Sequence, residues 1–175
     1  MGLDYLTTLR TRGCIKSEVA ELRHWSHVLG DVVSDVWFYT DELTFLPNRK
    51  AYDSRERLPV QVWIDVKDLY RINEQFGERV GDEVLWRVAR TLEATGVTTF
   101  RLFADKFALE CNTSWRAQLI LTQLRTSLLL ERIPVPPAPS RLPTWLEISC
   151  WCGIGGTLLE AEHVATGAKR RRSFK

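Results

Sequence analysis

The sequence predicts an α+β fold with the element order βααββαβ followed by a terminal helix, and three observations carry this prediction. Residues 60–66 are mostly β-branched or aromatic, which favours a largely buried strand that brings Asp65 to its C-terminal end. Apolar residues then recur at helical spacing on both sides of Gly77, which predicts two amphipathic helices. Residues 98–111 predict a hairpin with Asp105 at or near its tip.

The second half of the chain supplies the remaining elements. Ser114 is the expected N-cap of a helix over residues 115–131, whose leucines form a thick apolar face. Residues 133–143 contain five prolines, which exclude a helix or central strand and predict a stiff extended connector. A proline-rich ligand for a partner is the alternative to a plain loop. Residues 144–154 then predict a strand, and residues 158–172 a final helix.

An N-terminal helical segment over residues 1–40 is expected to precede a domain over residues 41–175. Apolar residues between positions 15 and 37 follow the spacing of one long amphipathic helix. Ser26 and Gly30 lie within that span, so the helix is not an ideal coiled-coil seam. It either contacts a second subunit or folds back on its own domain, and the sequence favours neither.

Composition bounds the class of protein. With 175 residues, 45% of them hydrophobic, the chain suits one domain plus an appended segment. A formal charge of +2 is too small to indicate nucleic-acid binding, and the basic run at residues 169–172 is expected to be solvated. The four cysteines form neither a disulfide nor a zinc pattern, which predicts reduced thiols. No apolar run approaches membrane-spanning length, so a soluble cytoplasmic protein that binds neither membrane nor nucleic acid is expected.

Several blocks of the sequence, in order, resemble the motifs of the GGDEF domain, the catalytic domain of diguanylate cyclases. Residues 41–53 (DELTFLPNRKAYD) resemble the opening segment D-x-L-T-G-L-x-N-R. Residues 64–85 resemble the block D-I-D-x-F-K-x-I-N-D-x-x-G and its continuation, and residues 101–108 (RLFADKFA) occupy the place of R-x-G-G-D-E-F-A. Residues 148–155 and 168–169 resemble the last strand and helix of the domain.

This resemblance covers residues 41–172 and implies a palm-like central antiparallel sheet flanked by helices. In the family, two metal ions hold the triphosphate of GTP, and the 3′-hydroxyl of one nucleotide attacks the α-phosphate of another held by a second subunit. By the resemblance, Asp65 and Asp105 match the carboxylates that hold these metals. The family's product-binding R-x-x-D site is replaced by residues 94–97 (ATGV), so feedback binding of cyclic-di-GMP there is not expected.

The same resemblance implies a nucleotide site at three further positions. Asn73 and Asp82 match the side chains that read the guanine edge, and Lys169 matches a lysine that contacts phosphate. The alternative for the first two is structural: Asn73 pins a helix turn, and Asp82 caps the next helix beside Gly81.

The signature itself departs from the family pattern, because Gly-Gly-Asp-Glu-Phe is replaced by Phe103, Ala104, Asp105, Lys106 and Phe107. Lys106 stands in place of the glutamate, and a charged ammonium can neither bind Mg²⁺ nor accept a proton. Lys67 replaces the second aspartate of the strand-end block. The bulk of Phe103 is expected to plug the nucleotide pocket, where the family has glycine. We also expect Lys106 to pair with Asp65 and Lys67 to pair with Asp105, opposite charges replacing the ions.

Three functions are compatible with these residues. The favoured one is a degenerate GGDEF domain without cyclase activity, a regulatory module that needs no cofactor and binds GTP or another guanine nucleotide, or a protein. The alternative is an active or atypical cyclase that uses GTP and Mg²⁺ and finds its missing ligand elsewhere, for instance at Glu110 or Glu147. The third is a structural dimerisation module that forms a homodimer through the N-terminal helix.

Overall fold

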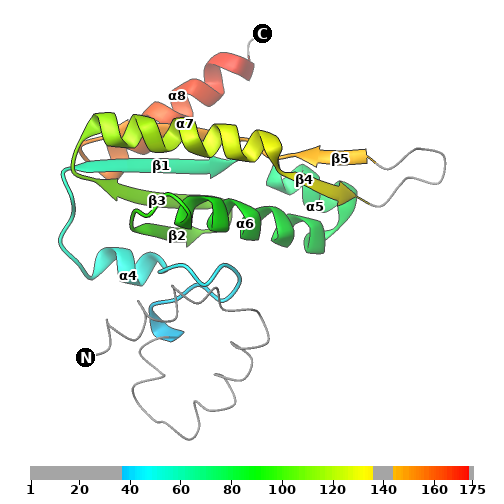
Figure 1. Ribbon diagram of the computed structural model, residues 1–175, viewed down its shortest axis with the longest axis horizontal. Coiled ribbons are helices and arrows are strands. Elements are labelled where there is room, and N and C mark those ends of the chain that lie inside the picture. The colour runs from blue at the N-terminus through cyan, green and yellow to red at the C-terminus, as the bar shows by residue number, and fades with distance from the viewer. Residues whose placement is uncertain (1–36, 136–143, 174–175) are drawn as a thin grey trace, which may run out of the picture.

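The computed structural model describes residues 37–135 and 144–173, and their centre is a four-stranded sheet (Figure 1). Its strand order is β2-β3-β1-β6, and every neighbouring pair is antiparallel. The strands are β1 (Val60–Val66), β2 (Thr99–Phe103), β3 (Lys106–Cys111) and β6 (Cys150–Gly155). The predicted α+β fold with a central antiparallel sheet is confirmed. Most of the predicted N-terminal helical segment and most of the proline-rich connector lie outside the described residues.

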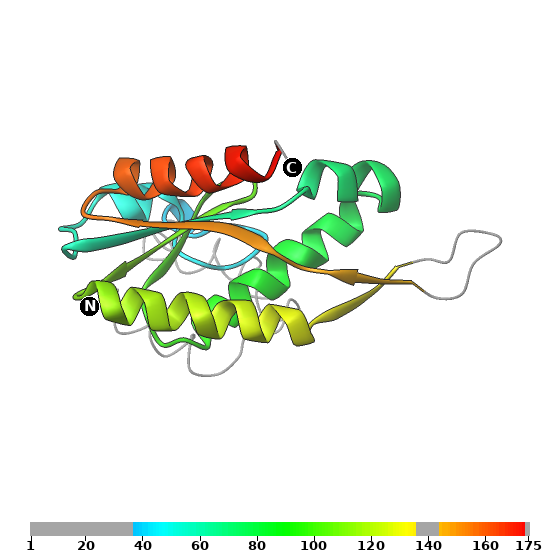
Figure 2. The ribbon, with the colours of Figure 1, turned by 90° about the horizontal axis from the view of Figure 1, so that it is seen from above.

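Helices cover both faces of this sheet: α4 (Arg49–Asp53), α5 (Leu69–Phe76), α6 (Glu78–Glu93), α7 (Ser114–Leu130) and α8 (Leu158–Ser173). Figure 2 shows α6 and α7 on one face and α8 on the other. The alternation of β1 matches this layering, because Val62 and Ile64 join the main core with α6 and α7, whereas Trp63 packs with the alanines of α8. Asp65 alternates in the same way and therefore lies on the α8 face.

Two glycines of β6 allow α8 to approach the sheet closely. A Cβ atom at Gly153 would lie 1.9 Å from the carbonyl oxygen of Ala161, and one at Gly155 would lie 2.6 Å from the Ala161 nitrogen. No side chain fits in that space, so glycine is required at both positions. The close approach brings the C-terminal half of α8 within reach of the end of β1.

The structure contains a second, two-stranded sheet where the sequence predicts an extended connector and one strand. β4 (Arg132–Val135) pairs with β5 (Thr144–Glu147), and residues 148 and 149 separate β5 from β6. Pro134 is tolerated because both strands of a two-stranded sheet are edge strands, where a missing N–H leaves no central ladder bond unmade. The single strand predicted over residues 144–154 is therefore two strands.

Helix starts also refine the predictions. The side chain of Thr113 accepts a hydrogen bond from the Arg116 nitrogen at 3.4 Å, so Thr113, not Ser114, caps α7. Helix α4 is short, as expected from the few residues before β1. Of the helices that the structure describes, none is long and apolar enough to cross a bilayer.

Candidate functional site

The C-terminal end of β1 and the turn of the β2–β3 hairpin meet at one end of the sheet. Asp65 lies opposite Lys106 in the β1–β3 register, and the Val66 nitrogen donates to the carbonyl oxygen of Asp105 at 2.9 Å. The hairpin turn consists of Ala104 and Asp105, as its sequence predicts. Asp65 is buried, with 12% of its side chain exposed. The fold thus brings both predicted metal carboxylates to the same place.

Two lysines neutralise these carboxylates. The Lys106 ammonium forms an ion pair with the Asp105 carboxylate, and its Nζ lies 3.7 Å from Asp65 Oδ2. The Nζ of Lys169, which reaches across from α8, lies 3.4 Å from the same oxygen. We call Asp65, Asp105, Lys106 and Lys169 the strand-end charge cluster. Its formal charges sum to zero, since two carboxylates face two ammonium groups.

The predicted pairing of charges is confirmed for Lys106 and wrong for Lys67. The Lys67 Nζ lies 4.1 Å from the centre of the Trp151 ring, a cation–π contact. Among the described residues no ion pair joins Lys67 to Asp105. The physical reason is backbone geometry, because the Lys67 nitrogen donates to the Ser149 carbonyl oxygen at 2.9 Å and holds this residue beside β6 rather than the hairpin. The second lysine of the cluster is instead Lys169, which contacts Asp65 and not Asp105.

Sequence reasoning assigned Lys169 to a phosphate and missed it as a partner of Asp65. The two residues lie 104 positions apart, and only the close packing of α8 on β6 brings them together. The glycines at positions 153 and 155 were the available signal for that close packing.

Phe103 stands beside the cluster on the α8 face. Its ring is 49% exposed and meets Trp63 edge-on, with 6.1 Å between ring centres. The Lys106 Nζ lies 6.0 Å from the centre of the Phe103 ring. The ring thus occupies surface next to the carboxylates; that it blocks a nucleotide remains a prediction.

A buried arginine supports the hairpin turn from the other side. Arg101 Nε and Nη2 donate to the Ala104 carbonyl oxygen at 3.2 and 2.7 Å, and Nη1 donates to Asp41 Oδ1 at 2.8 Å. The same oxygen of Asp41 accepts from the nitrogen and hydroxyl of Thr44 at 2.8 and 2.7 Å. We call Asp41, Thr44 and Arg101 the turn-support network. Sequence reasoning did not predict it, although all three residues lie in matched motif blocks.

The two predicted guanine-reading positions lie on the α5–α6 helix pair. Asn73 packs against Gly81, where any Cβ atom would lie 1.8 Å from Asn73 Oδ1. That oxygen is buried and has no hydrogen-bond partner within the described part of the chain. Asp82 is exposed and lies inside α6, whose N-cap is Gly77, so the alternative that Asp82 caps this helix is wrong. An orphaned polar oxygen at Asn73 is the kind of group that a ligand donor satisfies.

Comparison with known families decides what this arrangement belongs to. Residues 38–154 match the family described as "Diguanylate cyclase, GGDEF domain", which is more than half of the chain. The chain belongs to the GGDEF domain family. The predicted family is therefore confirmed, and it relates the chain to cyclic-di-GMP signalling. No curated protein sequence matches the chain.

Solved GGDEF domains share the fold at low sequence identity. The coiled coil and GGDEF domain of DgcB from Caulobacter crescentus, in complex with c-di-GMP, superposes with a TM-score of 0.67 at 20% identity, covering 88% of this chain and 90% of that one. The diguanylate cyclase SiaD of Pseudomonas aeruginosa, in complex with its activator SiaC, gives 0.64 at 22% identity, covering 96% and 72%. The FimX GGDEF domain from the same organism gives 0.63 at 16% identity, covering 76% and 94%.

In this GGDEF domain the residues at the strand end do not fit a Mg²⁺ ion. Proteins hold Mg²⁺ through one or two carboxylates together with water and substrate phosphates. Here both carboxylates of the strand end already face ammonium groups. Asp65 Oδ1 is buried and has no hydrogen-bond partner among residues 37–135 and 144–173, but Oδ2 of the same carboxylate faces two ammonium groups. Two like charges about 4 Å apart repel by about 4 kcal/mol at an effective dielectric near 20, so an incoming cation meets strong opposition.

The structure also places the alternative ligands of an atypical cyclase away from this GGDEF strand end. Glu110 lies opposite Gln61, four positions before Asp65 on β1, which corresponds to about 13 Å along a strand. Its carboxylate accepts from Gln61 Nε2 at 3.3 Å and lies 3.6 Å from Arg55. Glu147 is exposed at the end of β5 in the second sheet. Neither residue joins Asp65.

The cysteines do not supply ligands either. Cys111, Cys150 and Cys152 are free thiols, as predicted for the cysteines that the structure describes. Burial raises the pKa of Cys152 to about 11 and the pKa of Cys150 well above its usual value. Both thiols are therefore neutral at physiological pH, and a neutral thiol is a poor metal ligand.

Proposed function

We propose that this GGDEF domain makes no cyclic-di-GMP and acts as a regulatory module that binds a guanine nucleotide without Mg²⁺. The observation that carries the proposal is the Lys106 ammonium, which pairs with Asp105 and stands 3.7 Å from Asp65. In an active cyclase of this family, a metal ion would be expected beside these two carboxylates. The change from glutamate to lysine in the signature thus places a positive charge of the protein itself beside both carboxylates.

Phosphoryl transfer depends on positioning and on neutralising the charge that develops on the transferred group. Metals serve both purposes because they bind several oxygens at once in a fixed geometry. A lysine supplies a point charge alone, and it cannot accept the proton of an attacking hydroxyl while it is charged. Replacement of the signature glutamate by Lys106 therefore removes a metal ligand and a candidate base in one step.

Nucleotide binding has weaker requirements than catalysis. The Asn73 Oδ1 atom is buried without a partner in the described residues and can accept a hydrogen bond from a guanine N–H. Asp82, exposed on α6, supplies a second acceptor. Lys169 and Lys67 are suited to phosphate oxygens, since lysine is an adequate phosphate ligand. We accordingly propose GTP, or another guanine nucleotide, as the ligand and the cytoplasm as the location.

Calorimetric titration with GTP and with ATP, each with and without EDTA, tests the binding proposal. We expect weak binding of GTP, unchanged by EDTA, and weaker binding of ATP. Asn73→Leu serves as the disabling variant, and Glu74→Gln, its exposed neighbour, is the matched control. A preference for ATP, or binding that requires Mg²⁺, contradicts the proposed site.

Incubation with GTP and Mg²⁺ or Mn²⁺, followed by product chromatography, tests the absence of cyclase activity. We expect no cyclic-di-GMP. Metal-dependent product from homogeneous protein would establish the atypical cyclase instead. Absence of both product and nucleotide binding would favour a module that works through a protein partner or a homodimer.

A further inference from the structure

The two edges of the main sheet differ in whether another segment of the described chain covers them. At the β2 edge, the Arg101 nitrogen donates to the Pro47 carbonyl oxygen at 2.9 Å, so the segment that leads into α4 covers that edge. At the other edge, β6 pairs with β1 alone within the part of the chain that the structure describes. An uncovered edge strand presents unpaired N–H and C=O groups to any extended segment that reaches it.

The hydrogen-bond register identifies the groups that face outward. The Lys67 nitrogen bonds to the Ser149 carbonyl oxygen, so the pair 67/149 is hydrogen-bonded. Hydrogen-bonded and non-hydrogen-bonded pairs alternate along an antiparallel ladder. The main-chain N–H and C=O groups of residues 151, 153 and 155 therefore point toward β1. Cys150, Cys152 and Ile154 therefore direct their N–H and C=O groups to the open edge. These are six main-chain groups in one row.

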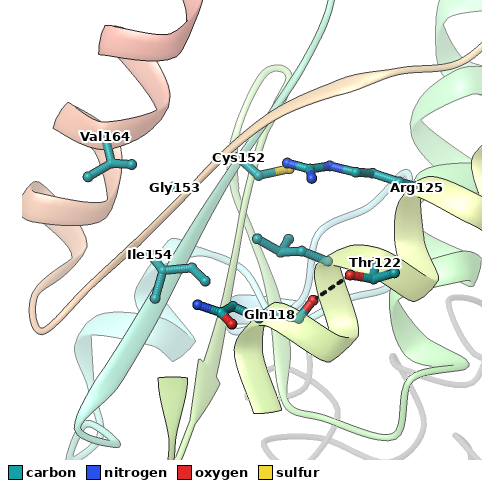
Figure 3. Close-up of a pocket in the computed structure, with 8 residues that line it drawn as sticks. Gln118, Thr122, Arg125, Cys152, Gly153, Ile154 and Val164 are labelled. Atoms are coloured by element: carbon teal, nitrogen blue, oxygen red, sulfur yellow. Dashed lines mark hydrogen bonds between the residues drawn. The ribbon is translucent and has the colours of Figure 1, made fainter. Parts of the chain in front are cut away.

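This edge lies at the bottom of a groove between two helices. Figure 3 shows β6 running between α7, which carries Arg125, Thr122 and Gln118, and α8, which carries Val164. One hollow of about 430 Å³ adjoins residues 152–154, and a second of about 420 Å³ adjoins residues 148–152. Cys152 and Arg125 line both hollows, so together the two follow the whole edge. Seven residues of extended chain span about 23 Å, which matches residues 148–154.

The charge of the groove defines what it accepts. Lys67 and Arg125 line it, and no carboxylate does so among the residues that the structure describes. Arg125 is exposed on the α7 side and points toward Cys152 in Figure 3. On the α8 side the lining is apolar or small, with Val164 at 54% exposure and Ala168. A strand added at this edge would direct alternate side chains to these two sides.

We propose that the groove along β6 binds an extended acidic segment of a partner protein, which adds a strand to the sheet. Main-chain bonds to Cys150, Cys152 and Ile154 would supply affinity, and contact of acidic side chains with Arg125 would supply specificity. The opposite face of the inserted strand would present small apolar side chains to Val164. Of the proposed nucleotide residues only Lys67 lines this groove. Binding of the segment does not depend on nucleotide binding, because the main-chain groups of β6 and Arg125 take no part in the proposed nucleotide site.

A fluorescent heptapeptide, acetyl-TVEVEVT-amide, is the probe for the full chain. Its glutamates share one face of an extended strand and its valines the other. We expect saturable binding by fluorescence anisotropy and slowed amide exchange at Cys150, Cys152 and Ile154. The lysine peptide TVKVKVT should bind at least tenfold more weakly, and a probe with alternate N-methylated amides should not bind.

Arg125→Glu is the decisive variant, because it reverses the charge at an exposed position and leaves the residues of β6 unchanged. We expect it to invert the preference between the glutamate and lysine peptides. Arg116→Glu, on the same helix but not among the groove residues, should leave the preference unchanged. Failure of every peptide to bind, or equal binding to wild type and Arg125→Glu, overturns the proposal. If protection of the β6 amides from exchange instead increases with protein concentration in the absence of peptide, a second copy of the chain occupies the edge. That outcome also overturns the proposal.

Discussion

The two sides of the hairpin turn contrast sharply. On one side, the turn-support network joins Asp41, Thr44 and Arg101, residues at which the chain keeps the family pattern, through direct hydrogen bonds of 2.8 Å or less between side chains. On the other side, the strand-end charge cluster joins Asp65 and Asp105 to two lysines, one of which replaces a family carboxylate. The same turn is thus held on one side by residues that match the family motif and on the other side by an ion-pair cluster in which a lysine stands where the motif has a glutamate.

This contrast teaches which contacts the fold needs. At the hairpin turn Ala104 adopts a φ of 46°, and Arg101 stabilises this conformation by donating two hydrogen bonds to the Ala104 carbonyl oxygen. At the strand end, two ammonium groups offset the charge of the two carboxylates. Under the proposed function, the charges at the strand end have changed while the fold around them is that of the GGDEF family.

The largest expected effect comes from breaking the turn-support network. Arg101→Met removes the charged partner of the Asp41 carboxylate, which keeps only Thr44 as a donor among the described residues, and both side-chain donors of the Ala104 carbonyl oxygen. It should lower the free energy of unfolding by about 3 kcal/mol. Urea denaturation measures this change. Arg49→Met removes a surface pair with Asp53 whose side chains are 49% and 51% exposed, and should change stability by less than about 0.5 kcal/mol. Equal losses for the two variants would show that the network has no special role.

The second-largest effect is expected from removing Lys106 from the strand-end charge cluster. Lys106→Met removes the cation between Asp65 and Asp105 and should cost about 2 kcal/mol of stability, because the two carboxylates then repel. Added Mn²⁺ should restore part of the melting temperature in this variant and not in wild type. Lys106→Glu should not restore cyclase activity, since Phe103 and Lys67 remain. A wild-type melting temperature that rises with Mn²⁺ would contradict the account.

A smaller effect concerns access to the cluster. Phe103→Ala removes a half-exposed ring beside Lys106, and should tighten GTP binding by about tenfold, or about 1.4 kcal/mol, if the ring restricts the nucleotide. Calorimetry measures the affinity. Tyr70→Ala, which removes an exposed aromatic ring from α5, is the control and should leave the affinity unchanged. Unchanged binding in Phe103→Ala would show that the ring does not plug a pocket.

The smallest effect lies in the turn itself. Ala104→Gly relieves the positive φ at a position where an alanine is strained, and should raise stability by about 0.5–1 kcal/mol after the entropy cost of glycine. Thermal denaturation detects a change of this size. Gly96 also has a positive φ, of 72°, and Gly96→Ala should lower stability by a similar amount. A destabilised Ala104→Gly variant would mean that the turn is not strained.

Much of the fold could be predicted because its signals are local. The alternating strand at residues 60–66, the helical spacing around Gly77 and the hairpin with Asp105 near its tip each depend on near neighbours in the sequence. Ordered motif blocks then gave the arrangement of the sheet. The β4–β5 sheet was missed because Pro134 argues against a strand unless the strand is known to be an edge.

The charge cluster was only partly predictable, because it depends on contacts distant in sequence. Lys106 could be placed from the hairpin register, which sets it opposite Asp65. Lys169 could not, because its reach depends on how closely α8 packs on β6. Lys67 was misplaced because the aromatic face of Trp151 competes for its ammonium, and the two residues are far apart in sequence.

The central claim is that lysines have replaced metals at the strand end, and electron paramagnetic resonance of Mn²⁺ titrated into the full chain with GTP tests it most directly. The account predicts that all Mn²⁺ stays in solution or on GTP, with the same spectrum for wild type and Asp65→Asn. A protein-bound Mn²⁺ signal in wild type that disappears in Asp65→Asn would contradict it.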